Sequence, residues 1–298
     1  MAPKFRVFAF VLAATISSAW AQPKTKMIIG TGVDPSLAQF YVAKEAGIFE
    51  RNGLDVQLNQ GPSGSAMIAF LIGDQIQAAL GAELAGIPAH NLDANVAAAG
   101  ESVQLPHFYG LVARHVDTFD ALKGKKIGVD SGSSSQNFWL ALVSTLHLDP
   151  KDYTIVQVEP PEMIAALERG DIDAFAAWEP WVTRALEGIP GTRNLRDNAG
   201  IIVPRDYVYM NRGWVERNKP AGQIAHLLKL DPGLPETLMA KVDYGMRLDN
   251  DSLAHMREIE AQLKQSGKLT KPVDWSNFFL TDPLRAAAPA AVTLDAPK

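Results

Sequence analysis

Short apolar runs alternate with amphipathic stretches along most of the chain, which is typical of α/β proteins. In the first part of the chain, serines and a proline stand where helices should begin. We expect strands at 27–32, 54–59 and 77–81, and helices from Pro35 to Gly47 and from Ser63 or Ser65 through Ile72. These elements form one strand–helix–strand–helix–strand unit.

A second unit of the same plan begins near residue 118. It should contain a short helix at 118–122, strands at 126–130, 154–159 and 174–178, and helices at 133–146, 162–169 and 179–187. Residues 107–114 and 207–214 read as strands that cross between the two units. The pattern beyond Lys219 is helical, most strongly over 252–265, and the Ala/Pro-rich tail after Pro289 is expected to be loose.

Two units joined by two crossings predict an α/β protein of two lobes, each a mixed sheet flanked by helices. We place lobe 1 at residues 22–112 plus 206–298 and lobe 2 at 113–205. A cleft between lobes is a favoured ligand site, and hinge closure around the ligand is its usual motion.

The amino-terminal segment has the layout of a secretory signal. Lys4 and Arg6 precede an apolar run that ends at Ala19-Trp20-Ala21, which has small residues where a signal peptidase cuts. We expect residues 1–21 to be removed, which leaves 277 residues and changes the formal charge from −5 to −7. An uncleaved anchor helix is the alternative. The expected location is the periplasm.

Composition excludes several classes of function. An acidic chain without a basic stripe argues against binding nucleic acid or anionic lipid. The chain has no cysteine, which excludes cysteine nucleophiles and thiolate metal sites. Its six histidines show no metal-ligand spacing, and no nucleophile elbow or dinucleotide fingerprint occurs. We therefore expect a protein that is not an enzyme and needs no cofactor or metal.

Three consecutive serines, Ser133, Ser134 and Ser135, open the helix expected after the strand at 126–130. A helix N-terminus offers unsatisfied N–H groups and partial positive charge, and Gly132 lets an anion approach the backbone. The run through Asn137 is therefore a candidate site for a sulfonate, phosphate, nitrate or carboxylate. An ordinary serine-rich helix cap is the alternative interpretation.

Two other segments of the chain should face the serine run across the cleft. At the end of the strand at 174–178, Trp178 is a candidate cleft wall and Glu179 suits a helix start, with one of Trp178 and Trp181 expected in the core. In open α/β sheets, ligands bind beyond the carboxyl ends of strands. That rule adds four first-lobe candidates, Val33, Asp34, Ala82 and Glu83.

The two first-lobe acids allow other roles. Asp34 can simply cap its helix. Glu83 either serves a ligand that also carries an amine or points to solvent. No arginine is obviously placed to neutralise a carboxylate.

Four segments resemble the nitrate/sulfonate/taurine group of periplasmic substrate-binding proteins of ABC transporters. They are YVAKEAGIFERNGLDV (41–56), LKGKKIGV (122–129), GSSSQN (132–137) and ALERGDIDAFAAWEPW (166–181). The similarity runs from about 27 to 284, and the serine run is closest to the sulfonate-binding branch. The resemblance implies a two-lobed periplasmic binding protein fold of type II.

The resemblance also implies roles. Ser133, Ser134 and Ser135 would hold the oxyanion head, with Trp178 and Glu179 on the second-lobe wall and the loops at 33–34 and 82–83 opposite. Glu83 departs from the sulfonate branch, where a small or hydroxyl residue is usual.

The expected function is the binding component of an ABC importer for an alkanesulfonate or taurine. We expect a monomer that docks transiently on the transmembrane subunits. The alternative ligand is an amine-bearing or heterocyclic molecule such as a thiamine precursor. Enzymes related to this group depend on cysteine, which this chain lacks.

Overall fold

The computed structural model describes residues 24–218 and 243–295. The expected signal segment, residues 1–21, and the part of the helical pattern at 219–242 lie outside the described residues. Within the described part of the chain, no helix is long and apolar enough to cross a membrane.

The first lobe is built on a six-stranded mixed sheet with the order β11-β4-β10-β3-β1-β2. β1 pairs in parallel with β2 and β3, whereas β10 runs antiparallel to β3 and β4. The strands are β1 (Thr25–Thr31), β2 (Leu54–Gln60), β3 (Ala78–Ala82), β4 (Val96–Gln104), β10 (Arg205–Asn211) and β11 (Asp243–Arg247).

The second lobe contains a five-stranded sheet with the order β7-β6-β8-β5-β9. Its strands are β5 (Tyr109–Arg114), β6 (Lys126–Val129), β7 (Thr154–Gln157), β8 (Ala174–Trp178) and β9 (Thr192–Asp197). β6 is parallel to β7 and β8, and β5 is antiparallel to β8. Each lobe thus has three parallel strands followed by an antiparallel one, as β2-β1-β3-β10 and β7-β6-β8-β5. The expectation of two mixed sheets flanked by helices is confirmed.

Helices cover both faces of the first sheet because its strands alternate their apolar side chains. On β10, Tyr207 and Tyr209 pack into the core beneath α3, α4 and α10, whereas Val208 and Met210 pack into the core beneath α1. The helical segments are η1 (Pro35–Leu37), α1 (Ala38–Glu45), α2 (Ile48–Arg51), α3 (Gly64–Ile72), α4 (Glu83–Leu92), α8 (Arg212–Arg217), α10 (Asn250–Gln265), α11 (Trp275–Phe278), α12 (Thr281–Ala287) and η5 (Pro289–Ala291).

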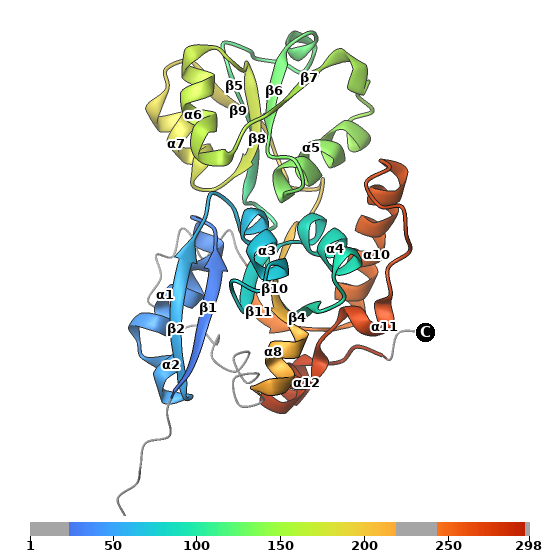
Figure 1. Cartoon of the computed structure of the whole chain (residues 1–298). Helices are drawn as coiled ribbons and strands as arrows, with labels where there is room; N and C mark the ends of the chain where they lie inside the picture. Colours follow the sequence, from blue (N-terminus) through green and yellow to red (C-terminus); the bar gives the residue numbers. More distant parts are fainter. Residues whose placement is uncertain (1–23, 219–242, 296–298) are drawn as a thin grey trace, which may run out of the picture.

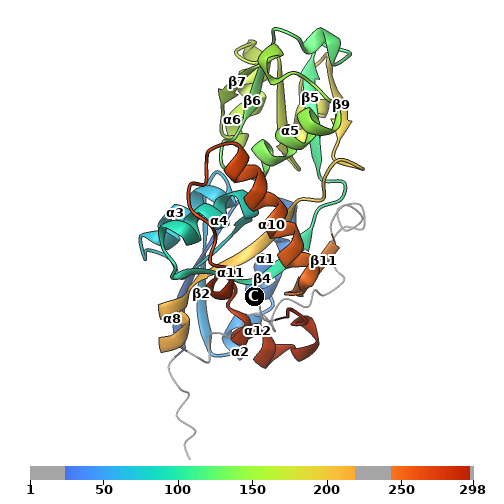
Figure 2. The same cartoon turned by 90° about the vertical axis from the view of Figure 1, so that its right-hand side faces the viewer.

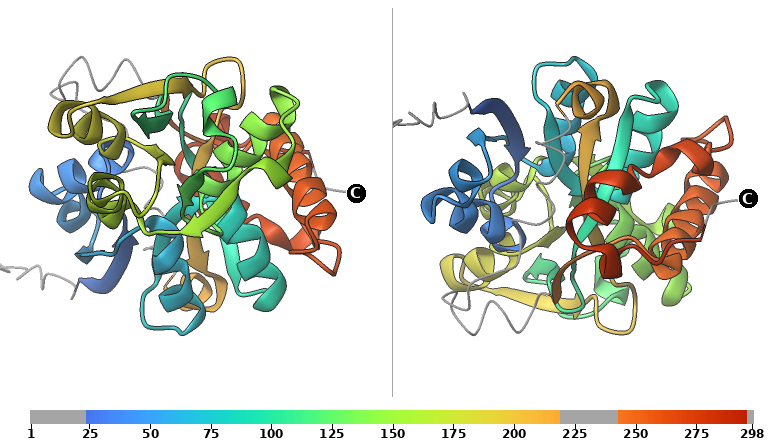
Figure 3. Two further views of the ribbon diagram at one scale, coloured as in Figure 1. Left: turned by 90° about the horizontal axis from the view of Figure 1, so that it is seen from above. Right: turned by 90° about the horizontal axis from the view of Figure 1, so that it is seen from below.

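In the second lobe, α6 packs beside α7, and α5 lies on the other side of the sheet (Figure 3). Apolar side chains from all three helices and from the strands form one core. The helical segments are η2 (Asp120–Leu122), α5 (Ser134–Thr145), η3 (Pro150–Asp152), α6 (Pro160–Arg169) and α7 (Trp181–Gly188).

Two crossings, residues 105–108 and 198–204, connect the lobes. The backbone N–H of Leu105 donates to the carbonyl of Pro204 over 2.9 Å, so the crossings lie side by side. The strands expected to pass between lobes do not do so: β5 belongs wholly to the second sheet and β10 to the first. The boundary between lobe 1 and lobe 2 therefore lies before Tyr109. The sequence pattern places this boundary after Val112, which lies inside β5.

The lobes stand one above the other (Figure 1), and residues of both lobes line a cavity. α10 rises along one side of the first lobe toward the second (Figure 2). There Lys268, just beyond α10, donates a hydrogen bond to the side chain of Gln136 on α5. The described part of the tail, residues 290–295, is not loose as expected, because Leu248 donates to Ala291 over 2.8 Å and accepts from Thr293 over 3.0 Å.

Candidate functional site

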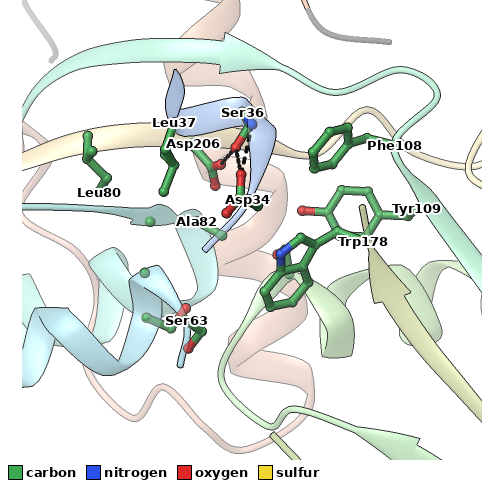
Figure 4. A pocket seen from close by; sticks show the side chains of 14 residues that line it. Asp34, Ser36, Leu37, Ser63, Leu80, Ala82, Phe108, Tyr109, Trp178 and Asp206 are labelled. Carbon is green, nitrogen blue, oxygen red and sulfur yellow. Dashed lines mark hydrogen bonds between the residues drawn. The ribbon is translucent and has the colours of Figure 1, made fainter. Parts of the chain in front are cut away.

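A small cavity lies between the lobes, where the parallel strands of both sheets end (Figure 4). Its wall comes from the loops after β1 and β2, from β3, from the first crossing and from the starts of α5 and β10. The lining residues are Asp34, Ser36, Leu37, Ser63, Gly64, Ser65, Leu80, Gly81, Ala82, Phe108, Tyr109, Ser134, Trp178 and Asp206.

Two carboxylates on the first-lobe side are linked by one hydroxyl. The Ser36 Oγ bonds to Asp34 and lies 3.2 Å from Asp206 Oδ2, and the Ser36 N–H donates to Asp34 over 2.9 Å. Asp34 caps η1 and also lines the cavity. A hydroxyl carries one proton, so it can donate to only one of the two ionised carboxylates. The other carboxylate receives no proton from this hydroxyl, although Asp34 still accepts from the Ser36 N–H.

The protonation of these acids follows from their surroundings. Burial raises the pKa of Asp34 from 3.8 to about 6, although its hydrogen bonds to Ser36 oppose the shift. Burial, followed by the charges of Asp34 and Glu83, raises the pKa of Asp206 well above its usual value. Asp34 and Asp206 together therefore tend to retain a proton.

Aromatic side chains form much of the cavity wall opposite Asp34 and Asp206. Tyr109 lies between Phe108 and Trp178, with ring centroids 6.0 Å and 6.1 Å away. Trp178 is only 6% exposed, and its indole N–H makes no hydrogen bond to any residue of the described chain. Figure 4 shows the Tyr109 and Trp178 side chains across the cavity from Asp34 and Asp206.

The serine run is occupied mainly with its own backbone. Ser133 Oγ donates to the Asp130 carbonyl over 2.8 Å and accepts from the Ser135 N–H over 3.1 Å. Ser135 Oγ donates to the Ala176 carbonyl over 2.6 Å and accepts from the Asp130 N–H over 3.0 Å. These two hydroxyls thus fasten the start of α5 to β6 and β8.

Ser134 is the one serine of the run that lines the cavity. Gly132 has a left-handed φ of 83°, and its N–H donates to Gln136 Oε1 over 2.8 Å. Asn137 is fully buried, and neither atom of its amide finds a hydrogen-bond partner among the described residues. Asp130 is buried beside the loop, and burial raises its pKa.

The other predicted residues are divided between the cavity and its surroundings. Ala82 lines the cavity, and Val33 borders a separate shallow hollow with Tyr41 and Pro180. Glu83 is fully buried rather than directed to solvent. Its Oε1 accepts from the Arg205 N–H over 3.0 Å and lies 2.5 Å from His255 Nε2.

The Trp-Glu-Pro-Trp run at 178–181 is divided between the cavity wall and the second-lobe core. Trp178 lines the cavity, whereas Trp181 is buried in the second-lobe core with the Arg184 guanidinium 5.0 Å from its ring centre. Glu179 accepts from the N–H and hydroxyl of Thr183 over 3.1 and 3.0 Å, so it helps to cap α7.

Sequence reasoning missed Ser36, Tyr109 and Asp206. Asp206 did carry a signal, because an acid at the start of the otherwise buried strand β10 requires an explanation. Phe108 and Tyr109 lie in a segment whose pattern predicts a crossing strand and gives no sign of a cavity wall. Among the residues that the structure describes, no cluster of histidines and acids could hold a metal ion.

Comparison with known proteins agrees with this architecture. A putative aliphatic sulfonates-binding protein of Bacillus subtilis (strain 168) is 28% identical over 162 residues, which are 52% of this chain and 49% of that protein. The chain thus matches about half the length of this curated relative. The identity supports the resemblance stated above and confirms distant homology to this group of binding proteins.

Two solved structures share the fold. The alkanesulfonate-binding protein SsuA from Xanthomonas axonopodis pv. citri, bound to MOPS, has a TM-score of 0.68 and 20% identity, over 92% of this chain and 100% of that one. The desulfurization enzyme DSZB has a TM-score of 0.61 and 18% identity, over 89% and 99%. A family model described as NMT1-like matches residues 20–229. The chain therefore belongs to the NMT1-like family and has the fold of periplasmic binding proteins.

Proposed function

We propose that this protein is the substrate-binding component of an ABC importer and that it works in the periplasm. The observation that carries the proposal is the cavity between two lobes that the chain connects through two paired crossings, residues 105–108 and 198–204. Ligand contacts on both lobes would favour the closed form, because a ligand shifts a population toward the state that it binds best. The closed form then docks on the membrane subunits.

The sequence favours a sulfonate-like ligand, such as an alkanesulfonate or taurine. The name of the Bacillus relative supports this choice, as does the position of Ser134 at the start of α5. The hydroxyls of Ser133 and Ser135 bond to backbone atoms, so Ser134 and backbone N–H groups would have to hold the anionic head. The ligand's other end would lie toward Asp34 and Asp206.

A catalytic role has less support. The shared fold includes a desulfurization enzyme, so fold alone does not separate the two functions. This chain has no cysteine, and the cavity lining contains no histidine, lysine or arginine among the described residues. A nucleophile would have to be a serine, and the hydroxyl of Ser36 has only the carboxylates of Asp34 and Asp206 beside it as bases.

The direct test is to identify the molecule that co-purifies with protein exported to a bacterial periplasm. We expect one small molecule per chain, released on unfolding and detected by mass spectrometry. Trp178→Leu should retain less of it, whereas Trp214→Leu, on α8 and outside the cavity lining, should retain it fully. Absence of any bound small molecule, together with no thermal shift across a broad solute panel, would refute the proposal.

A further inference from the structure

We infer that the ligand carries a positively charged nitrogen, a protonated amine or a cationic nitrogen heterocycle, held between Asp34 and Asp206 on one side and Tyr109 and Trp178 on the other. This inference rests on the proposed function, because it concerns the ligand of the same cavity. It narrows the ligand class to cations and zwitterions and disfavours simple anions.

The first ground is uncompensated negative charge on the first-lobe wall. Asp34 and Asp206 both line the cavity, and no described lining residue carries a positive charge. The neighbouring Arg205 cannot serve them, because its Nη1 lies 3.1 Å from Glu101 and 2.8 Å from Asp251. A buried carboxylate needs a cation or a proton nearby. In the loaded protein, the ligand is the remaining source of positive charge.

The second ground is the chemistry of the opposite wall. Tyr109 and Trp178 both line the cavity, and a cation that contacts the face of such a ring is bound most strongly when both are removed from water. Trp178 is 6% exposed and lines the cavity, and its indole N–H makes no hydrogen bond within the described chain. This N–H is therefore available to donate to an oxygen or nitrogen acceptor of the ligand.

The third ground is that the wall is poorly suited to a bare anion. Only Ser134 of the serine run lines the cavity, and the Asp130 side chain is buried beside the same loop. An alkanesulfonate without an amine would bring its negative charge into the cavity lined by Asp34 and Asp206, where no lining side chain carries a positive charge. A zwitterion such as taurine avoids this problem, because its ammonium can approach the acids while its sulfonate faces the start of α5.

The two carboxylates also couple the binding of a cationic ligand to the release of a proton. Burial raises the pKa of Asp34 to about 6, and the charge of Glu83 adds to the upward shift of the Asp206 pKa. Burial and the charges of these three acids raise the pKa of the facing Tyr109, so its hydroxyl stays neutral. His255 contacts the far side of Glu83. A cation bound to the pair favours the ionised carboxylates and so expels a proton. The affinity for a cation should therefore rise as the pH increases from 5 to 7.

The test uses pairs of probes that differ only in the charged nitrogen. Taurine is compared with isethionate, which has a hydroxyl in place of the ammonium, and benzylamine with benzyl alcohol. Binding is measured by calorimetry on ligand-stripped protein at pH 7. In at least one pair, the amine should bind about tenfold tighter or better, as expected for a charge-assisted contact. Asp206→Asn should reduce that preference about tenfold, whereas the exposed Asp171→Asn should leave it unchanged.

Asp34→Asn provides a second variant if Asp206→Asn does not fold, because Asp34 is only half-buried. Equal or tighter binding of isethionate and benzyl alcohol would overturn the inference. If no probe binds, the co-purified molecule decides: one with a basic nitrogen supports the inference, and one without it overturns the inference but leaves the importer function intact. Finding no bound molecule by either method would instead refute the proposed function.

Discussion

The side chain of Asn198 in the second crossing accepts a hydrogen bond from the backbone N–H of Phe108 in the first, over 2.9 Å. Its Oδ1 also accepts from the Tyr109 N–H over 2.9 Å. Its Nδ2 donates to the carbonyls of Leu105 and Ile202 over 2.7 and 2.9 Å. One fully buried amide therefore uses all four of its hydrogen-bonding positions to join the crossings and to position two aromatic residues of the cavity wall.

Replacing Asn198 by Asp should strongly destabilise the protein. The variant keeps the shape but removes both N–H donors and directs a carboxylate at two buried carbonyls. We expect a loss of roughly 3 kcal/mol in the free energy of unfolding, measured by urea denaturation. The control is Asn194→Asp on the exposed surface of β9, which should cost less than about 0.5 kcal/mol. Equal effects of the two substitutions would show that the crossings do not depend on this amide.

The serines of the run should separate into structural and ligand-facing residues. Ser135→Ala leaves the Asp130 N–H and the Ala176 carbonyl without their buried partner, and we expect it to cost about 2 kcal/mol of stability. Ser134→Ala should cost less and should change ligand affinity, because Ser134 lines the cavity. Parallel urea and binding titrations check both expectations. If Ser135→Ala weakens binding more than Ser134→Ala does, without loss of stability, this assignment is wrong.

The ligand-free protein should lose stability as the pH rises through about 6. The pKa of Asp34 is about 6 in the folded protein, above its ordinary value of 3.8, so between these values the folded state binds more protons than the unfolded state. This contribution is fully present below 3.8 and is lost as the pH rises through 6. Asp206, whose pKa is also raised, acts in the same direction.

Urea denaturation at several pH values between 4.5 and 7.5 measures the effect. Asp34→Asn should flatten the decline, because the asparagine does not titrate. Asp171→Asn, which removes an exposed partner of Arg169, should leave the slope as it is. A slope unchanged by Asp34→Asn would mean that this carboxylate does not titrate in that range.

Gly86 should not tolerate a side chain. A Cβ added to it would lie 1.9 Å from the ring of Tyr209, a fully buried residue of the core beneath α4. We expect Gly86→Ala to lower the free energy of unfolding by about 3 kcal/mol through overpacking. Gly188→Ala at the end of α7 is the matched control, because a Cβ there meets nothing within 4 Å. Its effect should stay below about 1 kcal/mol. Similar losses for both would argue against close packing of α4 on the sheet.

Local patterns determined the elements whose residues signal their own structure. β2 alternates buried Leu54 and Val56 with exposed polar positions, so its strand period is visible in the sequence. Ser63 and Ser133 cap α3 and α5 as their sequence positions indicated. Elements without such signals were missed. β4 is buried along almost its whole length and shows no alternation, and α4 contains Pro88 and Gly86.

The two-lobed fold followed from the repeated strand–helix plan and from the family resemblance, because both depend on residues close in sequence. Only the tertiary structure decided the composition of the cavity. Ser36, which bonds to Asp34, reaches Asp206 across 170 positions of sequence, and Asn198 reaches Phe108 across 90. No local periodicity encodes such pairs, because they arise from the order of strands in the sheet and from the return of the chain through the second crossing. For the same reason, the serine run could be recognised as a helix start, while the use of its hydroxyls depended on which backbone atoms the fold brought beside them.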